Sequence, residues 1–69
     1  MNENDILNLA CEAMNNGEVC KIKLPNAKEI HDFNMQIKSL EEKGFISIQK
    51  RNMTEIVLEL TEAGLEEVL

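Results

Sequence analysis

The sequence predicts a small α+β domain with the element order α-β-α-β-β-α, and two patterns together with the chain length support this. Apolar residues recur at helical spacing in two stretches, residues 5–16 and 27–43. Apolar and polar side chains alternate, as they do in half-buried strands, in three stretches, residues 19–24, 46–49 and 56–60. A chain of 69 residues buries only one core, so a single domain is expected.

The first predicted helix, residues 5–16, begins after Asn4 or Asp5, either of which suits an N-cap position. It stops before Gly17, because glycine tolerates the left-handed conformation that often ends a helix. The strand that follows ends at Pro25, which has no backbone N–H to donate to a neighbouring strand. The first third of the chain is therefore expected to form one helix and one short strand.

The second predicted helix, residues 27–43, has Asn26 as its N-cap and an acidic residue in its first turn. Its apolar side chains form one stripe, made up of Ile30, Phe33, Ile37 and Leu40. Because this stripe keeps its phase, one continuous helix is favoured over a single turn at residues 27–32 that restarts with Asp32 or Asn34 as a new N-cap.

The hairpin predicted next is placed in register by its own alternation. A slip by one residue would turn one strand inside out, so the core faces of the two strands must match. The matching pairs are Ile48 with Ile56 and Ile46 with Leu58. The loop left between the strands is Arg51-Asn52-Met53, in which Asn52 is able to take the left-handed position.

A short last helix is predicted after the hairpin. Thr61 caps its N-terminus, and Glu62 is favourable in the first turn because the N-terminus of a helix carries partial positive charge. Three apolar residues are expected to face the core, namely Leu65, Val68 and Leu69.

The element order and two short motifs resemble the winged-helix domains of bacterial transcription regulators. Leu40-Glu41-Glu42-Lys43-Gly44-Phe45-Ile46 is similar to the junction where their recognition helix ends in a glycine cap and enters the wing. Leu60-Thr61-Glu62-Ala63-Gly64-Leu65 is similar to the step that follows the wing. The resemblance covers residues 37–66. It implies a winged-helix-like domain over residues 1–69, with the hairpin as its C-terminal wing and DNA binding as its function.

The chain departs from that family in its helix-turn-helix. Only nineteen residues separate Leu24 from Gly44, where the family has a positioning helix, a turn and a recognition helix. A full helix-turn-helix does not fit comfortably in this length, so the helix-turn-helix is truncated. The usual way of inserting a helix into the major groove is therefore in doubt for residues 27–43.

The charge is segregated along the chain. The net charge of −6, from thirteen acidic and seven basic residues, by itself argues against a polyanionic partner. All seven bases, however, lie within residues 19–54 beside only four acids, whereas the two ends carry acids alone. The middle of the chain is therefore able to face an anion while its ends repel one, although chance clustering on a solvated surface explains the same pattern.

The candidate DNA contacts come from three predicted elements. They are Lys21 and Lys23 on the first strand, Lys28, His31, Lys38 and Ser39 on the outward face of helix 27–43, and Lys50, Arg51 and Asn52 at the hairpin tip. Lys and Arg suit phosphate contacts, whereas Ser and neutral His suit phosphate or a base edge. The alternative interpretations are a solvated helix face, ordinary turn chemistry, and lysines that keep an edge strand from pairing with another chain.

The alternative function is an acidic protein-protein interaction module, an adaptor or a phage-type inhibitor, that does not bind DNA. Met35 is predicted to be exposed on the outward face of the second helix, and its flexible thioether suits a protein groove. Phe45 and Val57 are surplus apolar residues on the outer face of the hairpin, which suggests a homodimer contact. The partner is therefore double-stranded DNA in a bacterial or phage regulator, or another protein.

No catalytic residue, metal site or cofactor is predicted. His31 and Asp32 are adjacent on a helix and point about 100° apart, so they do not form a general-base pair. Cys11 and Cys20 have neither Cys-x-x-Cys spacing nor a plausible ligand set, and both are expected to be reduced. The apolar runs are too short for a membrane span and the first residues lack the charge of a signal peptide, so a cytoplasmic location is expected.

Overall fold

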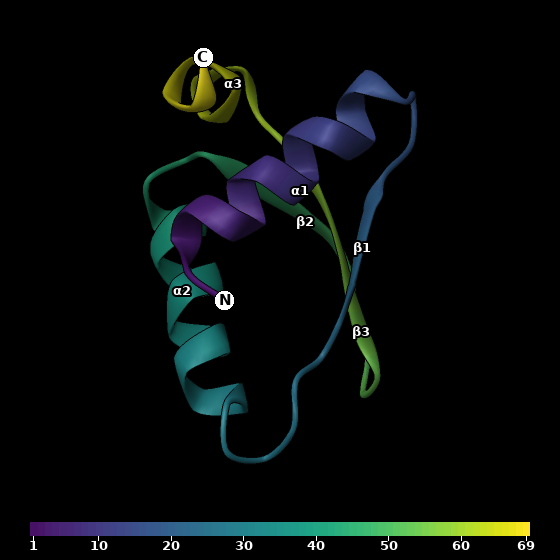
Figure 1. Ribbon diagram of the computed structural model, residues 1–69, viewed down its shortest axis with the longest axis vertical. Helices are drawn as coiled ribbons and strands as arrows, with labels where there is room; N and C mark the ends of the chain where they lie inside the picture. The colour runs from purple at the N-terminus through teal and green to yellow at the C-terminus, as the bar shows by residue number, and fades with distance from the viewer.

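The computed structural model describes all 69 residues and has the predicted α+β class and element order (Figure 1). The helices are α1 (Glu3–Asn15), α2 (Ile30–Glu42) and α3 (Glu62–Val68), and the strands are β1 (Cys20–Lys23), β2 (Ile46–Arg51) and β3 (Glu55–Leu60). The strands form one antiparallel sheet in the order β1-β3-β2. None of the helices has the length and apolar character that crossing a membrane requires.

The core lies between one face of the sheet and the helices α1 and α2. Every helix but α3 and every strand contributes to it, and its five most deeply buried large side chains are Ile6, Ile37, Leu40, Ile56 and Leu58. Along β1 the buried and exposed residues alternate, because successive side chains of a strand point to opposite faces. The opposite face of the sheet is covered by no helix.

The start of α1 differs from the prediction. The N-cap is Asn2, not Asn4 or Asp5, and the helix begins at Glu3. The Asp5 N–H donates to Asn2 Oδ1 at 2.9 Å and the Asn2 N–H donates to Asp5 Oδ2 at 3.0 Å. This reciprocal capping box satisfies two N–H groups, whereas a single cap satisfies one. The helix ends as expected before Gly17, which has a φ of 72°.

The second helix is continuous, as favoured, but begins three residues later than predicted. Asn26 does not cap α2 itself. Its Oδ1 accepts from the N–H groups of Lys28 at 3.1 Å and Glu29 at 3.2 Å, and so closes a turn before the helix. No new cap forms at Asp32 or Asn34, because α2 runs without a break from Ile30 to Glu42.

The predicted hairpin register is wrong by two residues. Ile46 lies opposite Leu60, and Ile48 lies opposite Leu58. A shift of two residues leaves the same side chains on the same face, so alternation alone does not distinguish the two registers. A bulge between Ile48 and Lys50 then adds one residue to β2 and changes the pairing beyond it.

The hairpin loop also lies one residue later than predicted. Arg51 belongs to β2, and the connection between the strands is residues 52–54. Asn52 Oδ1 accepts from the N–H groups of Thr54 and Glu55, both at 2.9 Å. The left-handed conformation expected for Asn52 is absent, because the only positive φ values belong to glycines. The side-chain hydrogen bonds of Asn52 close the turn instead.

The last helix begins as predicted, with the hydroxyl of Thr61 accepting from the Gly64 N–H at 3.0 Å. Leu65 and Val68 are partly buried against the core. Leu69 was expected to face the core but is 90% exposed, because α3 ends at Val68 and the last residue extends beyond it.

Candidate functional site

The open face of the sheet carries three of the basic residues predicted to contact DNA. Lys21 and Lys23 lie on β1, Lys50 lies on β2, and all three are exposed. Lys21 and Lys50 both pair with Val57 of the central strand, one from each side. None of the three lysines forms an ion pair. They therefore remain available to an external anion or carboxylate.

The hairpin tip does not present Lys50 and Arg51 on one face. Beyond the bulge, Lys50 lies opposite Val57 on the open face, whereas Arg51 lies opposite Ile56, on the face that carries the core. Both basic side chains are exposed at the end of β2. The third predicted contact, Asn52, uses its side-chain oxygen within the turn.

The exposed face of α2 holds a second group of predicted residues. His31 and Lys38 are exposed there, with Met35 between them at 59% exposure, and Lys28 lies in the turn before the helix. Lys38 is the only Lys or Arg within α2, which also carries three acids, Asp32, Glu41 and Glu42. Phosphate contacts require an excess of positive charge, so this helix face is poorly suited to enter a DNA groove.

The prediction that Ser39 faces outward is wrong. Its hydroxyl is partly buried and donates to Glu3 Oε1 at 3.2 Å. Lys43 Nζ donates to the same oxygen at 3.0 Å, which forms the one ion pair of the structure. Glu3 thus joins the start of α1 to the end of α2, and Ser39 and Lys43 already have a partner within the chain.

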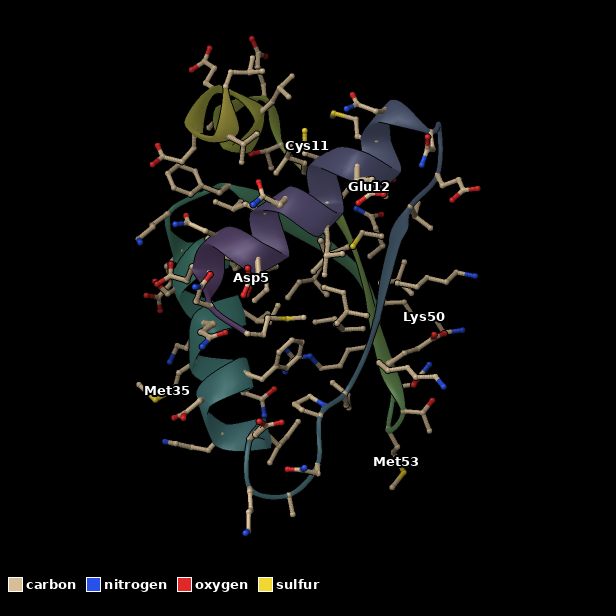
Figure 2. The ribbon with its side chains drawn as sticks, viewed as in Figure 1. Asp5, Cys11, Glu12, Met35, Lys50 and Met53 are labelled. Atoms are coloured by element: carbon tan, nitrogen blue, oxygen red, sulfur yellow. The ribbon has the colours of Figure 1, made fainter.

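The two groups of basic residues lie on different sides of the molecule. Figure 2 shows Met35, in the middle of the exposed face of α2, and Lys50, on the open face of the sheet, pointing in opposite directions. The structure therefore does not bring helix 27–43 and the hairpin together into one basic surface.

The apolar dimer patch expected on the hairpin is absent. Val57 is on the open face but is only 8% exposed, because it is flanked by Lys21 and Lys50, and long lysine stems shield the apolar surface beside them. Phe45 is partly buried and packs against the core cluster. Neither side chain offers the exposed apolar area that a homodimer contact needs.

The free edge of β1 is a feature that the sequence reasoning did not identify as a site. The Leu24 N–H donates to the Thr54 carbonyl at 3.0 Å. Hydrogen-bonded and non-hydrogen-bonded pairs alternate along an antiparallel ladder, so the backbone groups of Ile22 also point toward β3. The N–H and C=O groups of Lys21 and Lys23 consequently point away from the sheet, where no strand covers them.

A groove of about 680 Å³ runs beside this edge, between β1 and the C-terminal half of α1. Its apolar lining is Leu9, Ala13, Val19 and Cys20, and its polar lining is Glu12, Asn16, Glu18 and Lys21. Figure 2 shows Glu12 on this half of α1. Leu9 is 39% exposed and Val19 is 40% exposed, so apolar surface is accessible there.

The sequence contained a partial signal for this groove. Leu9 fits the helical spacing of residues 5–16, and Val19 belongs to the apolar and polar alternation of residues 19–24. The structure buries Ile6, Leu7 and Ala10 in α1 and leaves Leu9 at the edge of the buried stripe. The sequence signal for the groove is therefore an apolar residue, Leu9, that continues the apolar stripe of α1 beyond the residues buried in the core.

The two cysteines are free thiols, as expected. Cys20 is buried on β1, and desolvation by burial raises the pKa of its thiol. Cys11 is partly buried on α1. No group of three or more His, Cys, Asp or Glu side chains lies close enough to hold a metal ion.

Comparisons with protein-family models, curated proteins and solved structures found no match for this chain.

Proposed function

We propose that this chain is a small protein-interaction module that binds a partner at the free edge of β1 and in the groove between β1 and α1. The observation that carries this proposal is the row of unpaired backbone groups at Lys21 and Lys23, because Lys21 lines the same groove as the half-exposed side chains of Leu9 and Val19. An exposed strand edge is a template for another strand, and neighbouring apolar pockets add selectivity for its side chains.

The second strand edge of the sheet is less suited to the same role. β2 has a bulge between Ile48 and Lys50, and bulges disrupt the regular row of backbone groups that an added strand needs. β1 pairs with β3 without any irregularity. The regular edge and the apolar groove therefore coincide at β1.

Binding of duplex DNA is the second candidate function. It is supported by the lack of ion pairs at Lys21, Lys23 and Lys50 on the open sheet face, together with the resemblance of the sequence motifs to winged-helix regulators. It ranks second because α2, the counterpart of a recognition helix, carries more acids than bases. Two reduced cysteines suit the cytoplasm for either function, because that compartment keeps thiols reduced.

Site-specific photo-crosslinking tests the first candidate. A photoreactive amino acid is placed at Val19 in the groove or, as a matched control, at Met35, which is exposed on α2. We expect a discrete protein adduct from position 19 and none from position 35. The adduct protein, once purified, should bind the wild-type chain. Adducts from position 35 alone, or from neither position, would contradict the proposed surface.

DNA binding is tested by the salt dependence of duplex affinity. Loss of phosphate contacts lowers the slope of log affinity against log salt by about 0.9 per contact. If the second candidate is correct, replacing both Lys21 and Lys50 by Ala lowers that slope by roughly two units. If the first is correct, no duplex binding is detected at about 50 mM salt, where phosphate contacts are strongest.

A further inference from the structure

The structure of β1 and its neighbours restricts which partner fits the free edge, and this inference rests on the proposed function. We propose that the occupant is an extended segment of a partner protein in which acidic and apolar residues alternate. It pairs with β1 as a fourth strand, with its acids beside Lys21 and Lys23 on the open face and its apolar side chains in the groove beside Leu9 and Val19.

The alternation of β1 favours an acidic neighbour on its open face. Lys21 and Lys23 are exposed on the open face of the sheet, whereas Cys20 and Ile22 are buried on the core face. Cross-strand neighbours lie on the same face, so an added strand places every second side chain next to the lysines. Opposite charges stabilise such pairs and like charges destabilise them. Acidic residues are therefore favoured at these positions.

The strand β3, which pairs with the other edge of β1, shows which residues lie opposite the lysines. On the open face, Glu55 of β3 lies opposite Lys23 and Val57 lies opposite Lys21. On the core face, β3 places Ile56 opposite Ile22 and Leu58 opposite Cys20. β3 thus shows that β1 accepts an acid opposite Lys23 and apolar residues on the core face, with an apolar residue opposite Lys21.

The groove beside the edge carries more acidic than basic side chains. The charged lining of the groove is two acids, Glu12 and Glu18, and one base, Lys21, beside its apolar residues. These carboxylates repel acids from the groove, while the lysines attract acids to the open face. The two sets of charges therefore select both the composition of the strand and the face on which its acids lie.

A second copy of this chain is a poor occupant of the same edge. Antiparallel pairing of two β1 strands about Ile22 would place Lys21 of each copy opposite Lys23 of the other. Like charges directly opposite each other destabilise a strand pair. A polynucleotide is also disfavoured in the groove, because Glu12 and Glu18 face its phosphates.

The test uses three fluorescein-labelled synthetic peptides with blocked ends. The acidic peptide alternates Glu with Val and Ile, the basic peptide has Lys in place of every Glu, and the scrambled peptide has the acidic composition without alternation. Fluorescence anisotropy should show binding of the acidic peptide alone, because only that peptide matches both faces of β1. Equal binding of the acidic and scrambled peptides, or tighter binding of the basic one, would overturn the inference.

The Lys21→Pro variant separates strand pairing from simple charge attraction. Proline removes the Lys21 N–H, which points to the free edge, so the ladder with β3 keeps its hydrogen bonds. Lys21→Ala is the matched control, because it removes the charge and keeps the N–H. We expect Lys21→Pro to lower the affinity for the acidic peptide by about tenfold, and Lys21→Ala to lower it by about threefold. Equal affinities of the two variants would contradict strand addition.

Two further measurements test strand addition even if the Lys21→Pro variant does not fold. Hydrogen exchange on the wild-type chain should show new protection of the Lys21 and Lys23 amides when the acidic peptide is added. The double variant Lys21→Glu with Lys23→Glu should prefer the basic peptide. If a purified partner cross-links from position 19 but the acidic peptide does not bind, this inference is rejected and the proposed function stays in place.

Discussion

Gly64 of α3 packs directly against the backbone carbonyl of Phe45, in the segment that joins α2 to β2. The same carbonyl accepts from the Thr61 N–H at 3.0 Å, and the Thr61 hydroxyl donates to the carbonyl of Gly44. The two sequence motifs that resemble winged-helix junctions are thus in contact with each other. Their residues hold the first turn of α3 on the end of α2.

Replacing Gly64 by Ala should destabilise the fold. A Cβ at this position would overlap the Phe45 carbonyl oxygen and approach Leu60 Cδ1 to 2.7 Å. Backbone atoms move less readily than a side-chain end, so we expect a loss of about 1–3 kcal/mol in the free energy of unfolding, measured by urea denaturation. Glu66→Ala, at an exposed position of the same helix, is the control and should leave the urea midpoint almost unchanged.

The corrected hairpin register predicts which residues are energetically coupled. Truncating the fully buried Leu58 to Ala should cost about 2–5 kcal/mol. In double-mutant cycles, Leu58 should couple more strongly to Ile48, its cross-strand partner, than to Ile46, which lies opposite Leu60. Stronger coupling of Leu58 to Ile46 would contradict this register and support the one predicted from alternation, in which Ile46 lies opposite Leu58.

The buried thiol of Cys20 should make stability depend on pH in the alkaline range. Burial raises the pKa of Cys20, so the unfolded chain releases this proton at a lower pH than the folded chain. The stability that the folded chain gains by keeping this thiol protonated is fully present below the ordinary thiol pKa. It is lost as pH rises through the raised pKa. Between about pH 8 and about pH 10, the urea midpoint should therefore fall less in Cys20→Ala than in the wild type.

The link from Glu3 to Ser39 and Lys43 should contribute little and should depend on salt. Both charged side chains of the ion pair are substantially exposed, at 51% for Lys43 and 37% for Glu3. Exposed pairs stabilise proteins by about 0–1 kcal/mol, so Glu3→Gln should lower the free energy of unfolding by less than about 1 kcal/mol. The difference from wild type should shrink at about 1 M salt, where charges are screened within about 3 Å. A salt-independent difference would show that the hydrogen bond from Ser39 dominates.

The sequence alone was sufficient for the element order, the Thr61 cap and the glycine stops after α1 and α2. These features depend on residues that are close together in the chain. A helix stripe or a strand alternation reflects the period of its own backbone, and a cap is formed within three or four residues. The N-cap of α1 was missed because three neighbouring residues all suit that position and only the reciprocal bond between Asn2 and Asp5 distinguishes them.

Only the tertiary structure decided the hairpin register, the central position of β3 and the free edge of β1. A period of two residues is unchanged by a shift of two, so the alternation of β2 and β3 is equally compatible with Ile48 opposite Ile56 or opposite Leu58. Whether Lys21 and Lys23 lie at a free edge depends on which strand pairs with β1, and that pairing joins residues more than thirty positions apart. The candidate site exists because β3 covers one edge of β1 and nothing in the chain covers the other.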